Sequence, residues 1–168
     1  MCDLHLVGLT ADMETTEIIN RLCNSGCHVS TVKLSVKSLE ALQAACLRLG
    51  LTFVEGQTSY QWYGRYMGDS PLPAGVSVSD LGHCTHAIKV PGARYEIGVV
   101  AEADGTYSLR GDYWASGGLV EVLGKDLNKL RQAYGIEAAL LEAQRQGYSC
   151  WEEALEDGAV KLHVQVPA

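Results

Sequence analysis

The chain has 168 residues, of which 47% are hydrophobic, so it can form one domain with a full core and is not a disordered tail. Its net charge of −7 is spread along the whole chain, and the lack of a basic patch disfavours binding to the backbone of DNA or RNA. No apolar run approaches the roughly 20 residues of a membrane-spanning helix. The N-terminus lacks the pattern of a signal peptide, and six cysteines without paired spacing favour reduced thiols, so we expect a cytoplasmic protein.

The first half of the chain predicts short strands and two helices. Strands are expected at 3–9, 28–36, 51–54, 59–63 and 85–90, and helices at 12–23 and 39–49. Ser38 is a natural N-cap for the second helix, and Gly50 ends it. Residues 64–82 are rich in Gly and Pro and form one long irregular segment, which is typical of a functional loop or an insertion.

The clearest element is a β-hairpin over residues 94–114, RYEIGVVAEADGTYSLRGDYW. A two-residue Asp-Gly loop would pair Val99 with Arg110 and mix apolar and charged residues on one face. A three-residue loop with Gly105 in the left-handed conformation pairs Val99 with Leu109 and keeps the faces distinct, so we expect this register. The opposite face then carries Glu96, Gly98, Arg110 and Asp112.

The last third of the chain predicts a long helix and a second hairpin. The helix over 119–146 is interrupted at Gly124, and its apolar stripe indicates that it covers the sheet. The stripe consists of Leu123, Leu127, Leu130, Tyr134, Ala138 and Leu141. A hairpin over 148–166 with a three-residue loop places Lys161 opposite Glu153. Hairpins with helices to one side predict an α+β fold, a mainly antiparallel sheet covered on one side by helices in a two-layer sandwich.

Four stretches of the chain are distinctive when taken together. They are HVSTVKLSVKSLEALQAACLRLGL, YEIGVVAEADGTYSLRGDYW, LNKLRQAYGIEAALLEAQRQGY and EEALEDGAVKLHVQV. In this order they resemble an uncharacterised domain family of cyanobacteria, red-algal plastids and tailed phages, and DLGHCTHAIKVPGARYEIGVV looks most like the phage members. The resemblance implies a single α+β domain over 27–168, with an irregular loop at 64–82. Residues 1–26 then form an N-terminal extension of a strand plus a helix.

Aromatic residues gather around the irregular loop and the end of the central hairpin. They are Trp62, Tyr63, Tyr66 and Trp114, with Arg65 among them. Since Tyr, Trp and Arg are enriched at binding hot spots, these five residues predict a partner-binding surface. Packing in the core or within the loop is the competing interpretation.

The polar side of the long helix is a second candidate for partner binding. It presents Asn128, Lys129 and Gln132, and the corresponding segment of the resembling family is also polar. An ordinary solvated helix surface explains the same pattern.

A zinc site is the alternative that the histidines and cysteines suggest. His83, Cys84 and His86 lie within four residues, and His28, with Cys23 and Cys27, would complete a tetrahedral set. The spacing is not a repeated CxxC pair, and a buried thiol beside ordinary histidines is the competing interpretation. We therefore expect no cofactor, with zinc as the alternative.

The leading hypothesis for function is a non-enzymatic adaptor that binds another protein. The sequence holds no Gly-rich phosphate loop, nucleophile elbow or HExxH motif, so we assign no catalytic residue. Genes of the resembling family often lie near a gene for an AAA+ ATPase. The resemblance therefore implies that the partner is this ATPase or a host protein. For a phage-encoded member, the compartment would be the host cytoplasm. The alternative is a metal-dependent or small-ligand enzyme using the His28, His83, Cys84 and His86 set. Binding of single-stranded nucleic acid by the aromatic residues is disfavoured by the acidic balance.

Overall fold

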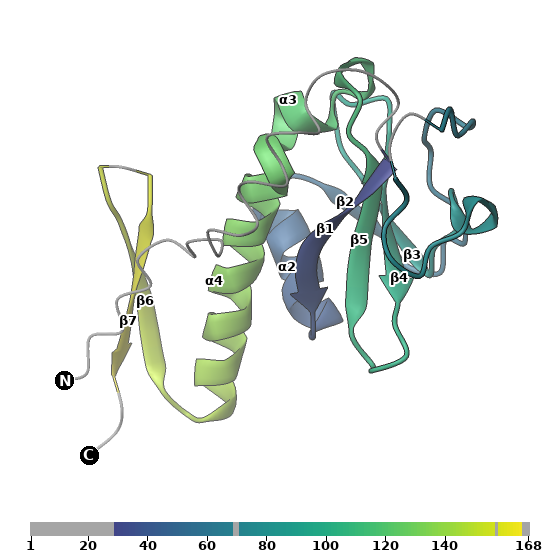
Figure 1. Cartoon of the computed structure of the whole chain (residues 1–168). Coiled ribbons are helices and arrows are strands. Elements are labelled where there is room, and N and C mark those ends of the chain that lie inside the picture. The colour runs from purple at the N-terminus through teal and green to yellow at the C-terminus, as the bar shows by residue number, and fades with distance from the viewer. Residues whose placement is uncertain (1–28, 69–70, 157, 166–168) are drawn as a thin grey trace.

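The structure, a computed structural model, describes residues 29–68, 71–156 and 158–165. Five antiparallel strands form a sheet in the order β1-β5-β4-β3-β2, and helices cover one of its faces (Figure 1). The strands are β1 (Val29–Val36), β2 (Thr52–Val54), β3 (His86–Lys89), β4 (Ile97–Ala101) and β5 (Tyr107–Asp112). The predicted α+β fold is confirmed. The elements expected at 3–9 and 12–23 fall outside the described residues.

The central hairpin has the register that keeps its apolar and polar faces apart. Val99 lies opposite Leu109 and Gly98 opposite Arg110, and Gly105 has a φ of 82°. Strand β4 begins only at Ile97, and its first pair with β5 is Gly98 with Arg110, so the part of the predicted hairpin before Ile97 is irregular. The apolar face packs under the helices, and the polar face is turned away from them.

Replacing Gly105 with valine tests this turn. A Cβ built on Gly105 meets nothing within 4 Å, so any cost of Gly105→Val comes from the backbone alone. We expect a loss of roughly 1–2 kcal/mol in the free energy of unfolding, because a β-branched residue tolerates the left-handed region badly. Urea denaturation measures it, with Ala103→Val in the same turn as the control. Equal stability of the two variants would contradict the turn.

The helical layer consists of α2 (Leu39–Arg48), α3 (Leu119–Leu123) and α4 (Asn128–Arg145). Ser38 caps α2 as expected, since its Oγ accepts a hydrogen bond from the backbone N–H of Ala41 at 3.1 Å. The predicted interruption at Gly124 separates α3 from a short 3₁₀ turn, η3 (Lys125–Leu127), that leads into α4. Leu127 has a positive φ of 53° but is fully buried, so the apolar stripe continues through the break.

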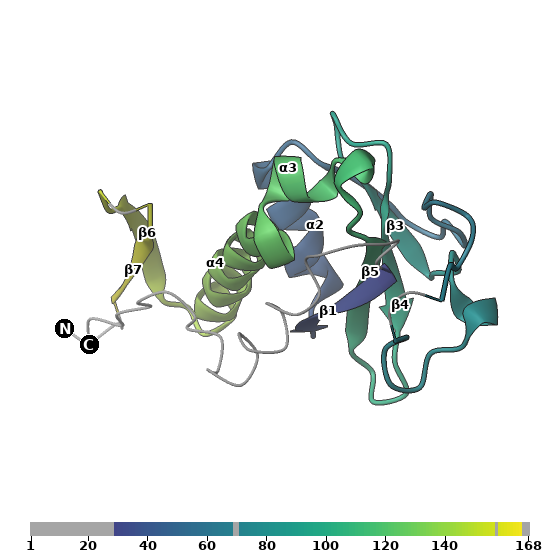
Figure 2. The same ribbon diagram turned by 45° about the horizontal axis from the view of Figure 1, so that its top comes forward.

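The last hairpin lies on the side of α4 that faces away from the main sheet (Figures 1 and 2). Its strands are β6 (Ser149–Ala154) and β7 (Val160–Gln165), and Glu153 faces Lys161 as predicted. Arg48 of α2 ties it to the domain, because its Nη1 and Nη2 contact the Glu152 carboxylate at 2.9 and 2.6 Å and its Nε contacts Glu137 at 2.7 Å. This arginine also holds the pKa of Glu152 below its ordinary value.

The described part of the chain between β2 and β3 lies over the face of the sheet opposite the helices (Figures 1 and 2). Residues 64–68 and 71–82 form no regular element apart from the 3₁₀ turn η1 (Val78–Asp80). The strand expected at 59–63 does not form, and only an isolated bridge joins Ser59 to His83. Residues 59–63 cross the sheet instead of joining it. Their backbone N–H groups therefore donate to side chains and to loop carbonyls rather than to a neighbouring strand.

None of the helices within the described ranges is long and apolar enough to cross a membrane.

Candidate functional site

Two carboxylates on the polar face of the sheet hold the segment 57–63 in place. The first belongs to Glu96, which accepts hydrogen bonds at 2.9 Å from the backbone N–H of Gln61 and from the side-chain amide of Gln57. The backbone N–H of Glu96 donates in return to the carbonyl of Gln61 at 2.8 Å. These bonds fix the segment against the start of β4.

Tyr60 fills a gap that the absence of a side chain at Gly98 leaves open. A Cβ on Gly98 would come within 2.4 Å of the Tyr60 ring, so any larger residue there would displace the ring. Tyr60 is buried, its hydroxyl finds no partner among the described residues, and burial raises its pKa. A glycine inside a strand is a known sign of close approach by another segment, and it was the available sequence signal for this contact.

Asp112, at the end of β5, is the second carboxylate and has no exposed surface. Its Oδ2 accepts the backbone N–H of Tyr63 at 3.2 Å, and its Oδ1 accepts the backbone N–H of Trp114 at 3.1 Å. The carboxylate of Asp112 therefore holds the backbone of Tyr63, which lies 49 residues earlier in the sequence, close to that of Trp114.

The two residues that Asp112 holds are both exposed. Tyr63 has 57% of its surface exposed and Trp114 has 39%, and we call these two residues the aromatic pair. Met67, which is 53% exposed, follows Tyr63 along the loop. Large apolar side chains on rigid backbone are the usual material of a binding surface.

The other predicted partner-binding residues of the loop differ from one another in their environment. Trp62 lies against the backbone of Gly82, where an added Cβ would come within 2.5 Å of its Nε1, so it packs within the loop. Arg65 is exposed and Tyr66 is half-buried. Among the aromatic residues of this loop, Trp62 thus stabilises the loop itself, whereas Tyr63 exposes its side chain to solvent.

The polar residues of the long helix are exposed, but two of them make internal bonds. Lys129 donates from Nζ to the carbonyl of Val122 at 2.9 Å, and Gln132 donates to the carbonyl of Gly158 at 3.1 Å. The side-chain oxygen of Asn128 lies beside Gly124. These bonds link α4 to α3 and to the turn of the last hairpin, a role that an amphipathic pattern does not reveal.

The predicted zinc ligands are placed on two faces of the sheet. His86 pairs with Val99 on the helix side, lies between the rings of Phe53 and Tyr107, and accepts the backbone N–H of Gly56 at 3.0 Å. His83 and Cys84 lie on the opposite side, and His28 falls outside the described residues. Across the described ranges, no group of three or more His, Cys, Asp or Glu side chains is arranged to hold a metal ion.

Cys84 is a protonated thiol rather than a nucleophile at neutral pH. Burial raises its pKa to about 11, and its Sγ donates to the carbonyl of Gln57 at 3.1 Å. The thiolate is the reactive form of cysteine, so this environment suits a structural role.

No family model, curated protein or solved structure matches this chain. The resemblance to the family of cyanobacteria, red-algal plastids and tailed phages therefore stays a prediction.

Proposed function

We propose that this chain is a protein-binding module, an adaptor, whose contact surface is centred on the aromatic pair Tyr63 and Trp114. The observation that carries the proposal is the Asp112 carboxylate, which binds the backbone of both residues while their side chains stay exposed. Because both backbone positions are fixed, less conformational entropy is lost when a partner covers the aromatic rings.

The chemistry of the aromatic pair suits a protein partner. Tyrosine and tryptophan combine a large apolar area with a hydrogen-bonding group, and both are enriched among residues that dominate interface energies. Arg65, a third residue type of binding hot spots, is exposed on the same loop. The sequence resemblance favours an AAA+ ATPase as the partner and the cytoplasm as the compartment.

The double variant Tyr63→Ala/Trp114→Ala tests the proposal. We expect it to melt within about 2 °C of wild type, since both side chains are exposed, and to lose at least tenfold in partner affinity, roughly the effect of one hot-spot residue. The measurement is binding of the purified protein to an AAA+ ATPase of the kind encoded near genes of the resembling family, alongside thermal denaturation.

The control is Trp151→Ala/Leu155→Ala, which removes two exposed apolar side chains from the last hairpin. It should bind like wild type. Binding that survives loss of the aromatic pair but fails in the control would place the contact on β6 and β7. A large fall in melting temperature for the first variant would show that the aromatic pair stabilises the fold.

A further inference from the structure

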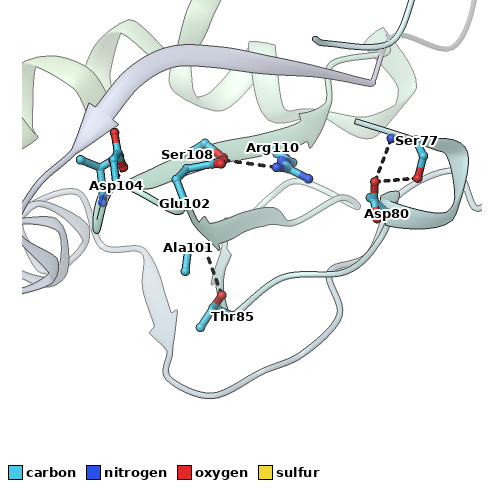
Figure 3. Close-up of polar contacts among 9 residues, drawn as sticks. Ser77, Asp80, Thr85, Ala101, Glu102, Asp104, Ser108 and Arg110 are labelled. Atoms are coloured by element: carbon cyan, nitrogen blue, oxygen red, sulfur yellow. Dashed lines mark hydrogen bonds and ion pairs between the residues drawn. The ribbon is translucent and has the colours of Figure 1, made fainter. Parts of the chain in front are cut away.

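A polar cleft of about 380 Å³ opens on the face of the sheet opposite the helices, between the end of the β2–β3 loop and strands β4 and β5. Its lining residues are Gly75, Asp80, His83, Cys84, Thr85, Val100 and Arg110. Several of them are drawn in Figure 3. The cleft is open to solvent and large enough for a small organic molecule.

Arg110 supplies the positive charge of this cleft from a largely buried position. Its side chain is only 13% exposed, and its Nη2 lies 3.2 Å from Glu102 Oε1. A guanidinium has five N–H donors, and among the described residues Glu102 is its only hydrogen-bonding partner. The N–H groups of Arg110 that face the open cleft are therefore available to a further acceptor.

The two acidic residues near Arg110 already accept hydrogen bonds from their own neighbours (Figure 3). Glu102 Oε1 accepts from the hydroxyl of Ser108 at 2.5 Å, in addition to the arginine. Asp80 Oδ2 accepts from the backbone N–H and the hydroxyl of Ser77 at 2.8 and 2.6 Å, which lowers the pKa of Asp80. Both acids border the cleft, and their repulsion disfavours a ligand with two negative charges.

Two further hydrogen-bond donors line the cleft beside Arg110. Thr85 Oγ1 accepts the backbone N–H of Ala101 at 3.2 Å, so its hydroxyl hydrogen is available to an acceptor in the cleft. His83 is exposed at the rim and offers a ring N–H. The thiol of Cys84 already donates to Gln57, so it forms a neutral part of the wall.

From this arrangement we infer that the cleft binds the carboxylate group of a small organic acid, with Arg110 as the charged donor and Thr85 and His83 as further donors. The guanidinium contacts Glu102 through Nη2, and its remaining N–H groups match the geometry of a second carboxylate. The site differs from the aromatic pair in residues and chemistry, so it stands or falls independently of the proposed adaptor role.

An NMR titration of the full chain tests this binding site. Sodium propionate, N-acetylglutamate amide and sodium phosphate are compared with sodium chloride at equal ionic strength and pH 7. We expect saturable shifts of the Arg110 Nε–H and the Thr85 amide with the two monocarboxylates, and about tenfold weaker binding of phosphate. Stronger binding of propionate identifies a free acid as the ligand, and stronger binding of the glutamate derivative identifies a peptide carboxylate. Equal shifts with chloride would overturn the inference.

Variants locate the bound carboxylate. Arg110→Gln should weaken propionate binding by about tenfold or more, the effect of losing a charge-assisted hydrogen bond, while Arg94→Gln at an exposed position should bind like wild type. If Arg110→Gln does not fold, Thr85→Val and Thr85→Ser decide the question. Weaker binding by the valine variant with wild-type binding by the serine variant supports the site, and unchanged binding by the valine variant overturns it.

Discussion

Leu130→Asp should unfold this protein. Leu130 lies in the middle of the apolar stripe of α4, has no exposed surface, and packs in the cluster that joins the helices to the sheet. An aspartate there would bury a carboxylate without a partner, which costs several kcal/mol, a large share of the roughly 5–15 kcal/mol by which a domain is stable. Circular dichroism during thermal denaturation would show the loss of a cooperative transition.

Gln144→Asp is the matched control, because Gln144 is exposed on the same helix. It introduces the same residue with little expected change, since surface substitutions usually alter stability by less than about 0.5 kcal/mol. A cooperative, wild-type melt of Leu130→Asp would mean that the stripe does not face the sheet.

Asp112→Ala should be the next most damaging change. It leaves the backbone N–H groups of Tyr63 and Trp114 without their acceptor and removes a fully buried side chain. We expect a loss of roughly 2–4 kcal/mol in the free energy of unfolding, as for other buried polar groups that lose their partners. Urea denaturation measures the loss, and the amide resonances of Tyr63 and Trp114 should shift or broaden.

Asp104→Ala is the comparison for this prediction. Asp104 also accepts a backbone N–H, that of Thr106 at 2.9 Å, but it does so in an exposed turn where water can replace it. Its loss should therefore be much smaller. If the two variants are equally stable, or if only Asp104→Ala is destabilised, Asp112 does not hold the aromatic pair.

Local patterns in the sequence predicted the regular elements because those patterns depend on near neighbours. The cap at Ser38, the break at Gly124 and the register of Val99 opposite Leu109 follow from turn chemistry and from the need to bury one face. The segment 59–63 was wrongly expected to be a strand. Its alternation of side chains is compatible with a strand. Its backbone N–H groups, however, donate to acceptors that include the carboxylates of Glu96 and Asp112, and not to a neighbouring strand.

The candidate sites depend on contacts between distant parts of the chain. Sequence alone selected Tyr63 and Trp114 by residue type, along with Trp62, Lys129 and Gln132, and it could not tell which of them make internal contacts. It placed Arg110 on the polar face of the hairpin but gave no sign of the cleft that the β2–β3 loop forms above it.

The sequence by itself therefore determined the α+β fold, the hairpin register and the apolar stripe of the long helix, since each follows from a spacing of two to four residues. Only the tertiary structure decided that Asp112 joins Tyr63 to Trp114 and that Thr85 and Arg110 share one cleft. The physical reason is that a buried carboxylate or guanidinium takes its partners from whatever segment the fold brings within about 3 Å, and sequence separation carries no information about that distance.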